Sequence, residues 1–467
     1  MRKKSTGCRK YRNRQDLMFF FVWKITSCIL YGTERFLYIS QMEGGECMQT
    51  SILWEGSLPS KEEIEHMKRE GYQFRSVDGG WKICLKLHNT PTGRWFADSF
   101  SKSFSKEVEL HRYLEQVEKH AIWFEVPSKK LRVYEVGQLL ESPKGEDECI
   151  CMEVLKDTKN HSHLLLKTDK EEVYQLGSSA ISTLENRARI SGAALSNVRP
   201  AVLDEILNQC LKGAKGKALL RVSEGKVRAV HSAEKNGYQV YPLPEVFMLA
   251  SVYIRGEYKK STFLEGYADQ TMVSATWQIE DKRLEEVYEE IMEKYGKQVK
   301  EKLTATIRIT SSDVAASGAN IFYSLMEGKR KIALGSDMRM RHNNSVEFQQ
   351  FTENLLSTFE CYKNALKGTV EKLCAISIEY PVNTIIGIMT KQGFGKKNVA
   401  EIVDRYKATF GDVPCTAYEV YCGIGEILFL AQSKGVSGRA MVELEEKVAK
   451  CLSVKWREYD IPGDLVY

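Results

Sequence analysis

Two hairpin patterns that share the turn tripeptide Glu-Gly-Lys constrain the fold of this chain most strongly. In the first, apolar residues 218–223 lead into the turn Glu224-Gly-Lys226, and a second apolar segment, 227–231, follows. In the second, residues 319–326 and 331–334 flank Glu327-Gly-Lys-Arg330. Glycine supplies the positive φ that a tight turn requires, and its charged neighbours remain exposed. Each pattern therefore predicts a pair of adjacent antiparallel strands.

Helical patterns surround these hairpins and dominate the end of the chain. From residue 345 to 452 the apolar residues recur at helical spacing. Further helices are expected at 105–120, 178–211 (interrupted near Ser191 and restarting after Arg199-Pro200), 242–254 and 283–295, and strands at 272–280 and 303–310. The predicted fold class is α+β, with antiparallel hairpins and packed helices followed by a mostly helical C-terminal region.

A chain of 467 residues is too long for one hydrophobic core and indicates several domains. We expect a leader at 1–47, an N-terminal α+β domain at 48–165, a central α+β domain with both hairpins at 166–344, and a helical region at 345–467. Turn signals such as Asp78-Gly-Gly80 predict antiparallel hairpins within the second of these segments.

The first 47 residues differ from the rest in charge and hydropathy. Residues 1–41 hold nine basic and two acidic side chains, whereas from Met48 onward 58 basic residues balance 58 acidic ones. The apolar run at 17–31 contains Lys24 and is shorter than the roughly 20 residues that span a bilayer. Export or membrane anchoring is therefore an alternative. We favour translation from Met48, a cytoplasmic protein and no membrane partner.

The twelve cysteines are scattered and include no Cys-x-x-Cys pair. Cys149-Ile-Cys151 lies in an apolar run that we interpret as a strand. Together with His161 and His163 it could supply the four ligands of a zinc site. Cysteines of this kind are more often small core residues of a reduced protein. We therefore predict neither a metal nor another cofactor.

Linear motifs for phosphate wrapping, dinucleotide binding and nucleophilic hydrolysis are absent from the sequence. Residues 392–397, Gln-Gly-Phe-Gly-Lys-Lys, have the wrong spacing for a phosphate loop and are expected to end one helix and start the next. Asp313, Glu327 and Lys329 could form the acidic pair and lysine of a metal-dependent nuclease. Turn chemistry is the favoured interpretation of Glu327-Gly-Lys329, because Glu224-Gly-Lys226 repeats the tripeptide in the other hairpin. No catalytic residue is therefore assigned.

The strongest local functional signal is a basic segment at 328–343 in a protein whose body is electrically neutral. In an extended segment, Arg339 and Arg341 would share one face, where two guanidinium groups could bind phosphate or carboxylate. A run of charges is more often a solvated face or a set of buried ion pairs. The predicted nucleic-acid-binding residues are Lys329, Arg330, Lys331, Arg339, Arg341 and His342.

Seven short stretches occur in the order typical of a known family. They are Leu176-Gly-Ser-Ser-Ala180, Asn186-Arg-Ala-Arg-Ile-Ser191, Leu220-Arg-Val222, Val227-Arg-Ala-Val230, Arg308-Ile-Thr-Ser-Ser-Asp-Val314, Met338-Arg-Met-Arg-His342 and Thr416-Ala-Tyr-Glu-Val-Tyr421. Over about residues 170–450 the chain resembles the phage- and plasmid-borne family catalogued as the domain of unknown function numbered nine hundred and thirty-two. It departs from that family at Ala315, where glycine is expected, and at Ile332-Ala-Leu-Gly335, where a Cys-x-Asn-Gly stretch is expected. The resemblance implies a mobile-element protein of the bacterial cytoplasm and carries no biochemical activity.

These observations favour a non-catalytic protein of phage or plasmid DNA metabolism that binds nucleic acid through residues 329–342. Single-strand binding or annealing is one form of this activity, because Phe322 and Tyr323 on the adjoining strand could stack on bases. One alternative is a metal-dependent enzyme acting on DNA or nucleotides through Asp313 and Glu327. Another is a module that binds a host or phage protein through the C-terminal helices. The oligomeric state is left open.

Overall fold

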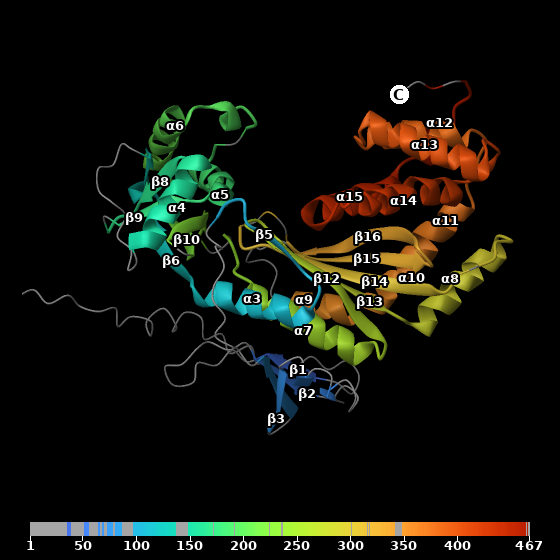
Figure 1. The fold of residues 1–467 in the computed structure, drawn as a ribbon, viewed down its shortest axis with the longest axis horizontal. Coiled ribbons are helices and arrows are strands. Elements are labelled where there is room, and N and C mark those ends of the chain that lie inside the picture. Colours follow the sequence, from blue (N-terminus) through green and yellow to red (C-terminus); the bar gives the residue numbers. More distant parts are fainter. Residues whose placement is uncertain are drawn as a thin grey trace, which may run out of the picture. The chain divides into compact units, whose positions relative to one another are not determined.

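The computed structural model describes residues 97–136, 148–340 and 348–463, apart from a few single positions, together with Leu465 and short segments between residues 35 and 85. It divides into two compact units, one formed by residues 1–58 and 64–86 and the other by residues 59–63 and 87–467. Each unit is described separately (Figure 1).

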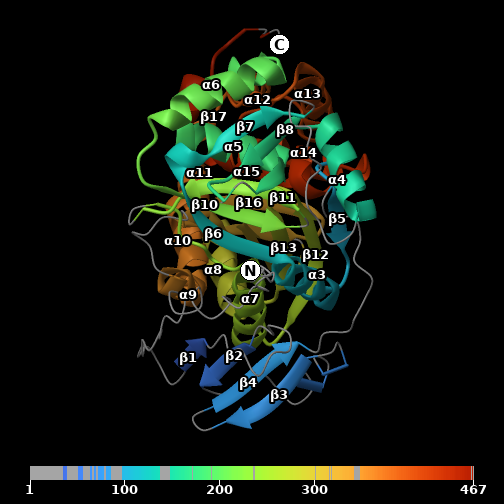
Figure 2. The same ribbon diagram turned by 90° about the vertical axis from the view of Figure 1, so that its left-hand side faces the viewer.

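The smaller unit contains a four-stranded antiparallel sheet with the strand order β1-β2-β4-β3. Figure 2 shows β2, β4 and β3 side by side. The predicted turn at Asp78-Gly-Gly80 does join two antiparallel strands. The strands are β1 (Arg35–Tyr38), β2 (Ser51–Glu55), β3 (Tyr72–Val77) and β4 (Gly80–Leu85). Of the predicted leader at 1–47, only the backbone of β1 is described.

The larger unit contains two six-stranded sheets, and the first has the strand order β6-β10-β11-β9-β8-β7. The predicted hairpin around Gly225 forms β10 and β11, and this glycine has a φ of +73°. The strands are β6 (Ala121–Pro127), β7 (Arg132–Glu135), β8 (Leu164–Lys167), β9 (Val173–Leu176), β10 (Lys217–Ser223) and β11 (Lys226–Ser232). This sheet therefore contains strands from both sides of the domain boundary predicted at residue 165.

One face of the first sheet carries the apolar core, because alternate residues of each strand point to the same side. Leu220 and Val222 of β10 pack there with Val227 of β11. Helices α5 (Ser178–Ala188) and α6 (Pro200–Lys212) cover this face with apolar side chains that include Leu184 and Leu207. The break between the end of α5 at Ala188 and the start of α6 at Pro200 confirms the interruption predicted near Ser191 and the restart after Arg199-Pro200.

The second sheet is antiparallel throughout and has the strand order β16-β15-β14-β13-β12-β5. The predicted hairpin around Gly328 forms β15 and β16, whereas β12 was not predicted. The strands are β5 (Ser101–Phe104), β12 (Ser261–Asp269), β13 (Val273–Ile279), β14 (Leu303–Ser311), β15 (Ala319–Glu327) and β16 (Arg330–Met340).

Helices cover both faces of the second sheet (Figure 1). Helices α3 (Glu107–Lys119), α7 (Leu243–Glu257) and α9 (Phe348–Leu356) lie on one side, and α14 (Ala417–Ser433) and α15 (Gly438–Lys450) lie on the other. The buried Glu107 carboxylate of α3 accepts a 2.8 Å hydrogen bond from Trp277 Nε1 and also pairs with Arg255 of α7. On the opposite face, the Tyr421 hydroxyl of α14 donates to the Ala333 carbonyl of β16.

The C-terminal third is helical, as predicted, with one two-stranded exception formed by β17 (Ser377–Ile378) and β18 (Cys415–Thr416). Thr416 and Glu419 form a reciprocal capping box at the start of α14. Besides four short 3-10 helices, the remaining described helices of the larger unit are α4 (Glu148–Asn160), α8 (Lys282–Lys294), α10 (Thr358–Ala365), the π-helical turn Leu366–Val370, α11 (Glu371–Cys374), α12 (Pro381–Lys391) and α13 (Lys396–Phe410).

The predicted α+β fold class is confirmed, and one local prediction is wrong. The segment around Cys149 and Cys151 belongs to α4 and is not a strand. The short apolar run resembled a strand because periodicity cannot distinguish a strand from a helix over so few residues. Among the described helices, none has the length and apolar character needed to cross a bilayer.

Candidate functional site

The face of the first sheet opposite its apolar core carries buried cationic side chains. Arg221 alternates with the core residues Leu220 and Val222 and therefore points to the other side. Val222 pairs with Val227 and Arg221 pairs with Ala229, so Arg228 is the extra residue of a β-bulge. Bulges redirect side chains and are common next to functional sites.

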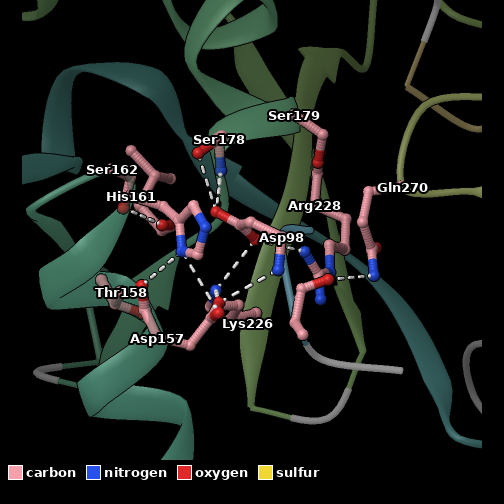
Figure 3. A network of polar contacts seen from close by, with 12 residues as sticks. Asp98, Asp157, Thr158, His161, Ser162, Ser178, Ser179, Lys226, Arg228 and Gln270 are labelled. Atoms are coloured by element: carbon pink, nitrogen blue, oxygen red, sulfur yellow. Dashed lines mark hydrogen bonds and ion pairs between the residues drawn. The ribbon is translucent and has the colours of Figure 1, made fainter. Parts of the chain in front are cut away.

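Lys226 lies at the centre of an ion-pair network that joins three segments (Figure 3). Its ammonium group is fully buried, 2.9 Å from Asp98 Oδ1 and in contact with Asp157 of α4. Arg228 Nη1 donates to the same oxygen of Asp98 at 2.8 Å. Asp98 Oδ2 accepts from the backbone N–H of Ser178 at 2.8 Å and therefore caps the start of α5.

The charge of Asp98 is well compensated by its neighbours. Burial alone would raise the pKa of the Asp98 carboxyl, but Arg228 and Lys226 outweigh burial and hold this pKa below its usual value. The network therefore keeps the Asp98 carboxyl ionised in the interior. Because removing one partner would leave an uncompensated buried charge, the network fixes how these segments pack.

Asp98, Asp157 and His161 form a group that could hold a metal ion, the one such group among the described residues. His161 Nδ1 is 3.2 Å from Asp157 Oδ1. The ammonium of Lys226 already lies against both carboxylates and supplies the positive charge there. The side chains of Cys149 and Cys151 lie outside the described part of the structure.

Arg221 forms a second buried ion pair beside this network. Its Nη2 lies 2.6 Å from Asp313 Oδ2 and 3.4 Å from Glu118 Oε2. Asp313 follows β14, so this pair connects the second sheet to the first. Burial raises the pKa of the Asp313 carboxyl to about 6, although Arg221 opposes that shift.

A cavity of about 50 Å³ lies between the two sheets, next to both ion pairs. Its polar lining comes from β10, β11, the β12–β13 turn and the segment after β14, and α3 and α7 contribute apolar groups. The polar residues include Arg221, Ser223, Arg228, Gln270, Thr271 and Asp313. This cavity brings polar side chains of both sheets together in one place.

The nuclease-like acidic pair that was the alternative interpretation of Asp313 and Glu327 is not brought together. Glu327 pairs in register with Leu303, the first residue of β14, whereas Asp313 follows the last residue of that strand. At about 3.3 Å per residue, the two carboxylates lie at opposite ends of a nine-residue strand. They cannot bind one metal ion in this fold.

Two of the basic side chains in the predicted nucleic-acid-binding segment 329–342 form ion pairs within the protein. Lys331 Nζ contacts the Glu445 carboxylate of α15, and Arg330 Nη1 lies 3.5 Å from Glu327 Oε2. Lys329 is exposed. Arg339 belongs to β16, but its side chain lies outside the described part, as do Arg341 and His342 altogether.

The two aromatic rings expected to stack on bases do not face solvent. Phe322 is buried beneath the guanidinium of Arg308, at 4.2 Å from the ring centre. Tyr323 is 2% exposed and packs edge-on against Tyr362. Neither ring is therefore placed to accept a nucleotide base.

A lysine-rich surface that the sequence analysis missed lies at the turn between α12 and α13. Gly393, with a φ of +73°, ends α12 in a Schellman motif, in which Phe394 N–H bonds the Met389 carbonyl at 3.0 Å. Lys447 Nζ of α15 donates to the Gly393 carbonyl at 3.2 Å and covers the Phe394 ring. We define the lysine surface as Lys391, Lys396, Lys397, Lys447 and Lys450.

The turn between α12 and α13 was predicted correctly, but its positive charge was not recognised as a sign of a binding surface. Three of these lysines lie within seven residues, and the two glycines between them could have indicated that a turn brings these lysines together.

No family model, curated protein or solved structure matches this chain. The family resemblance therefore remains a prediction.

Proposed function

We propose that this protein binds nucleic acid without catalysis, through contacts between the lysine surface and the phosphate backbone. The phage or plasmid setting and a role in DNA metabolism belong to the same proposal. The observation that carries it is that the five lysines of this surface form no ion pair with any described carboxylate.

Three lysines elsewhere in the larger unit do form ion pairs. Lys434 pairs with Glu401 at 2.5 Å, and this interaction occupies the carboxylate one turn beyond the start of α13. Lys294 pairs with Glu371 at 2.5 Å, and Lys331 pairs with Glu445. Unpaired ammonium groups clustered on one surface are what a polyanion requires, because each contact releases a counterion from the phosphate backbone.

The surface favours backbone contacts over base recognition. Phe394, the aromatic residue at its centre, is 7% exposed and covered by Lys447, so it offers no stacking face. The positive end of the α13 dipole adds to the potential of the lysines. We therefore expect binding that depends weakly on base sequence, to single strands and duplexes alike.

The experiment is fluorescence anisotropy with labelled single- and double-stranded DNA across a salt series. The test variant is Lys391→Ala/Lys396→Ala/Lys397→Ala. Its matched control is Lys217→Ala/Lys260→Ala/Lys302→Ala, which removes three exposed lysines that are each paired with a carboxylate. The slope of log K against log salt should fall by about 2.7 in the test variant, at about 0.9 per lost phosphate contact.

The control variant should bind within about twofold of the unaltered protein, since its lysines are engaged with Glu125 and Glu280. Equal losses in the two variants would mean that binding follows total charge and not the lysine surface. Undetectable binding of the unaltered protein to both DNA forms at low salt would overturn the proposal.

A further inference from the structure

Two buried arginines from adjacent strands line the cavity between the sheets. Arg221 of β10 and Arg228 of β11 have side chains that are 5% and 4% exposed. Burial lowers the pKa of Arg228, and repulsion from Arg221 adds to this shift, although Asp98 opposes it. Two guanidinium groups in one cavity wall are the usual arrangement for recognising a carboxylate or phosphate group.

The cavity wall has hydrogen-bonding capacity that the described residues do not use. Arg221 Nε is buried and has no acceptor among them. A buried donor without an acceptor is costly, so an acceptor supplied by a ligand would be stabilised there. A volume of about 50 Å³ accommodates roughly three to five non-hydrogen atoms, given that one water needs about 10–15 Å³.

The charges in this buried layer do not balance. Its ion pairs join the cations Lys226, Arg221 and Arg228 to the carboxylates Asp98, Asp157, Asp313 and Glu118, and Asp269, which also lines the cavity, is compensated by the nearby Arg439. These groups together carry one excess negative charge when Asp313 is ionised. An anion could therefore enter without adding charge if Asp313 takes up a proton at the same time.

We propose that this cavity binds a small oxyanion, such as a carboxylate group, between Arg221 and Arg228, with uptake of one proton by Asp313. The proton comes from solvent and neutralises the carboxylate that pairs with Arg221 in the unliganded protein. The oxyanion then accepts the guanidinium hydrogen bonds that Asp313 gives up. The site uses no residue of the lysine surface and is independent of the proposed nucleic-acid binding.

Several groups face Asp313 and set its titration. Arg221 of β10 pairs with it, Glu118 of α3 repels its charge, and His231 Nε2–H of β11 donates to its backbone carbonyl at 2.8 Å. Tyr113 of α3 and Tyr238 are also within electrostatic reach. Asp269 lies across the cavity, where its Oδ1 accepts from Thr271 N–H at 2.6 Å.

The coupling gives the site a distinctive pH profile. Because the Asp313 pKa is about 6, the proton-bound form is dominant at pH 5 and scarce at pH 7.5. Apparent affinity scales with the binding-competent fraction, so it should fall about thirtyfold between these two pH values. Asp313→Asn imitates the protonated carboxyl and should bind about thirtyfold more tightly than the unaltered protein at pH 7.5.

The test is isothermal titration of the full chain with formate and with sulfate, both of which keep their charge between pH 5 and pH 8. Sodium chloride at matched ionic strength serves as the control anion. Formate or sulfate should bind above chloride at pH 5, and Asp313→Asn should abolish the pH dependence. Arg221→Gln should abolish binding, whereas Arg405→Gln, at an exposed arginine that pairs with Glu426 and lies outside the cavity lining, should not.

Binding of formate alone would identify the oxyanion as a carboxylate, and stronger binding of sulfate would identify a tetrahedral oxyanion. The proposal fails if neither anion binds better than chloride at pH 5. It also fails if Asp313→Asn, shown to be folded by circular dichroism, binds no more tightly than the unaltered protein at pH 7.5.

Discussion

The β15–β16 turn and the α12–α13 turn are both basic in sequence but differ in how their charges are used. At the first turn, Arg330 pairs with Glu327 and Lys331 pairs with the buried Glu445. At the second, Lys396 and Lys397 begin α13 and have no carboxylate within 4 Å among the described residues. A run of basic residues therefore shows only where charge is located. Whether that charge is available to a ligand depends on residues far away in the chain.

Removing Glu445 should have the largest effect on stability. It tests whether the ion pair of Lys331 at the β15–β16 turn holds the fold together. The Glu445 carboxylate contacts both Arg308 and Lys331, and it is 5% exposed. Glu445→Ala removes the carboxylate partner of Lys331 and leaves the buried Arg308 with only the longer contact to Glu446 at 3.8 Å, so the free energy of unfolding should fall by about 3–5 kcal/mol. Urea denaturation measures this, and a loss under about 1 kcal/mol would show that the pairing of Lys331 is incidental.

Acid should weaken the same contact. Although burial alone would raise it, the pKa of Glu445 is held below its usual value by Arg308 and Lys331. A carboxyl of this kind stabilises the fold above its unfolded pKa of about 4.3, and this stability is lost as the pH falls through the folded value. Glu445→Gln should therefore show a flatter loss of stability than the unaltered protein below about pH 4. Parallel acid profiles for the two proteins would contradict the assignment.

Charge reversal at the second turn should weaken DNA binding without changing stability. Lys396→Glu/Lys397→Glu places two carboxylates at the start of α13, where the helix dipole favours negative charge, so the fold should be unaffected within about 0.5 kcal/mol. Affinity for DNA at low salt should fall at least about tenfold. Anisotropy measures the DNA affinity and thermal denaturation measures the stability of the same preparations. An unchanged affinity would mean that these two lysines do not contact the DNA.

Truncating Arg330 should have the smallest effect. Its guanidinium is 39% exposed and 3.5 Å from Glu327, which is the geometry of a weak surface pair. Arg330→Ala should change the free energy of unfolding by under about 1 kcal/mol and DNA affinity by less than about twofold. A tenfold loss of DNA affinity would instead indicate that the β15–β16 turn contacts the DNA.

Local patterns in the sequence predicted the hairpins and most helices, because turn glycines and apolar periodicity act over a few residues. The failure at Cys149 came from a short apolar run that fits either a strand or a helix. The buried network could not be foreseen in the same way. Lys226 is a turn residue in sequence, and it meets Asp98 only because segments 128 residues apart pack together.

The candidate site shows the same limit. Asp313 was singled out from the sequence, but with Glu327 as its partner, whereas the fold pairs it with Arg221 of the other hairpin. The β-bulge at Arg228 shifts the strand alternation by one residue, so simple alternation misjudges which face the following residues occupy. Tertiary pairing of this kind requires knowledge of the sheet order.

The most direct test of the central claim is the salt dependence of DNA binding by two double variants, Lys396→Ala/Lys397→Ala and Arg330→Ala/Lys331→Ala. Each removes two positive charges from a basic turn, so net charge is matched. If the unpaired lysines of the α12–α13 turn contact phosphate, the slope of log K against log salt falls by about 1.8 in the first variant and by less than about 0.9 in the second. An unchanged slope in the first variant, with a fall of about 1.8 in the second, would contradict the account.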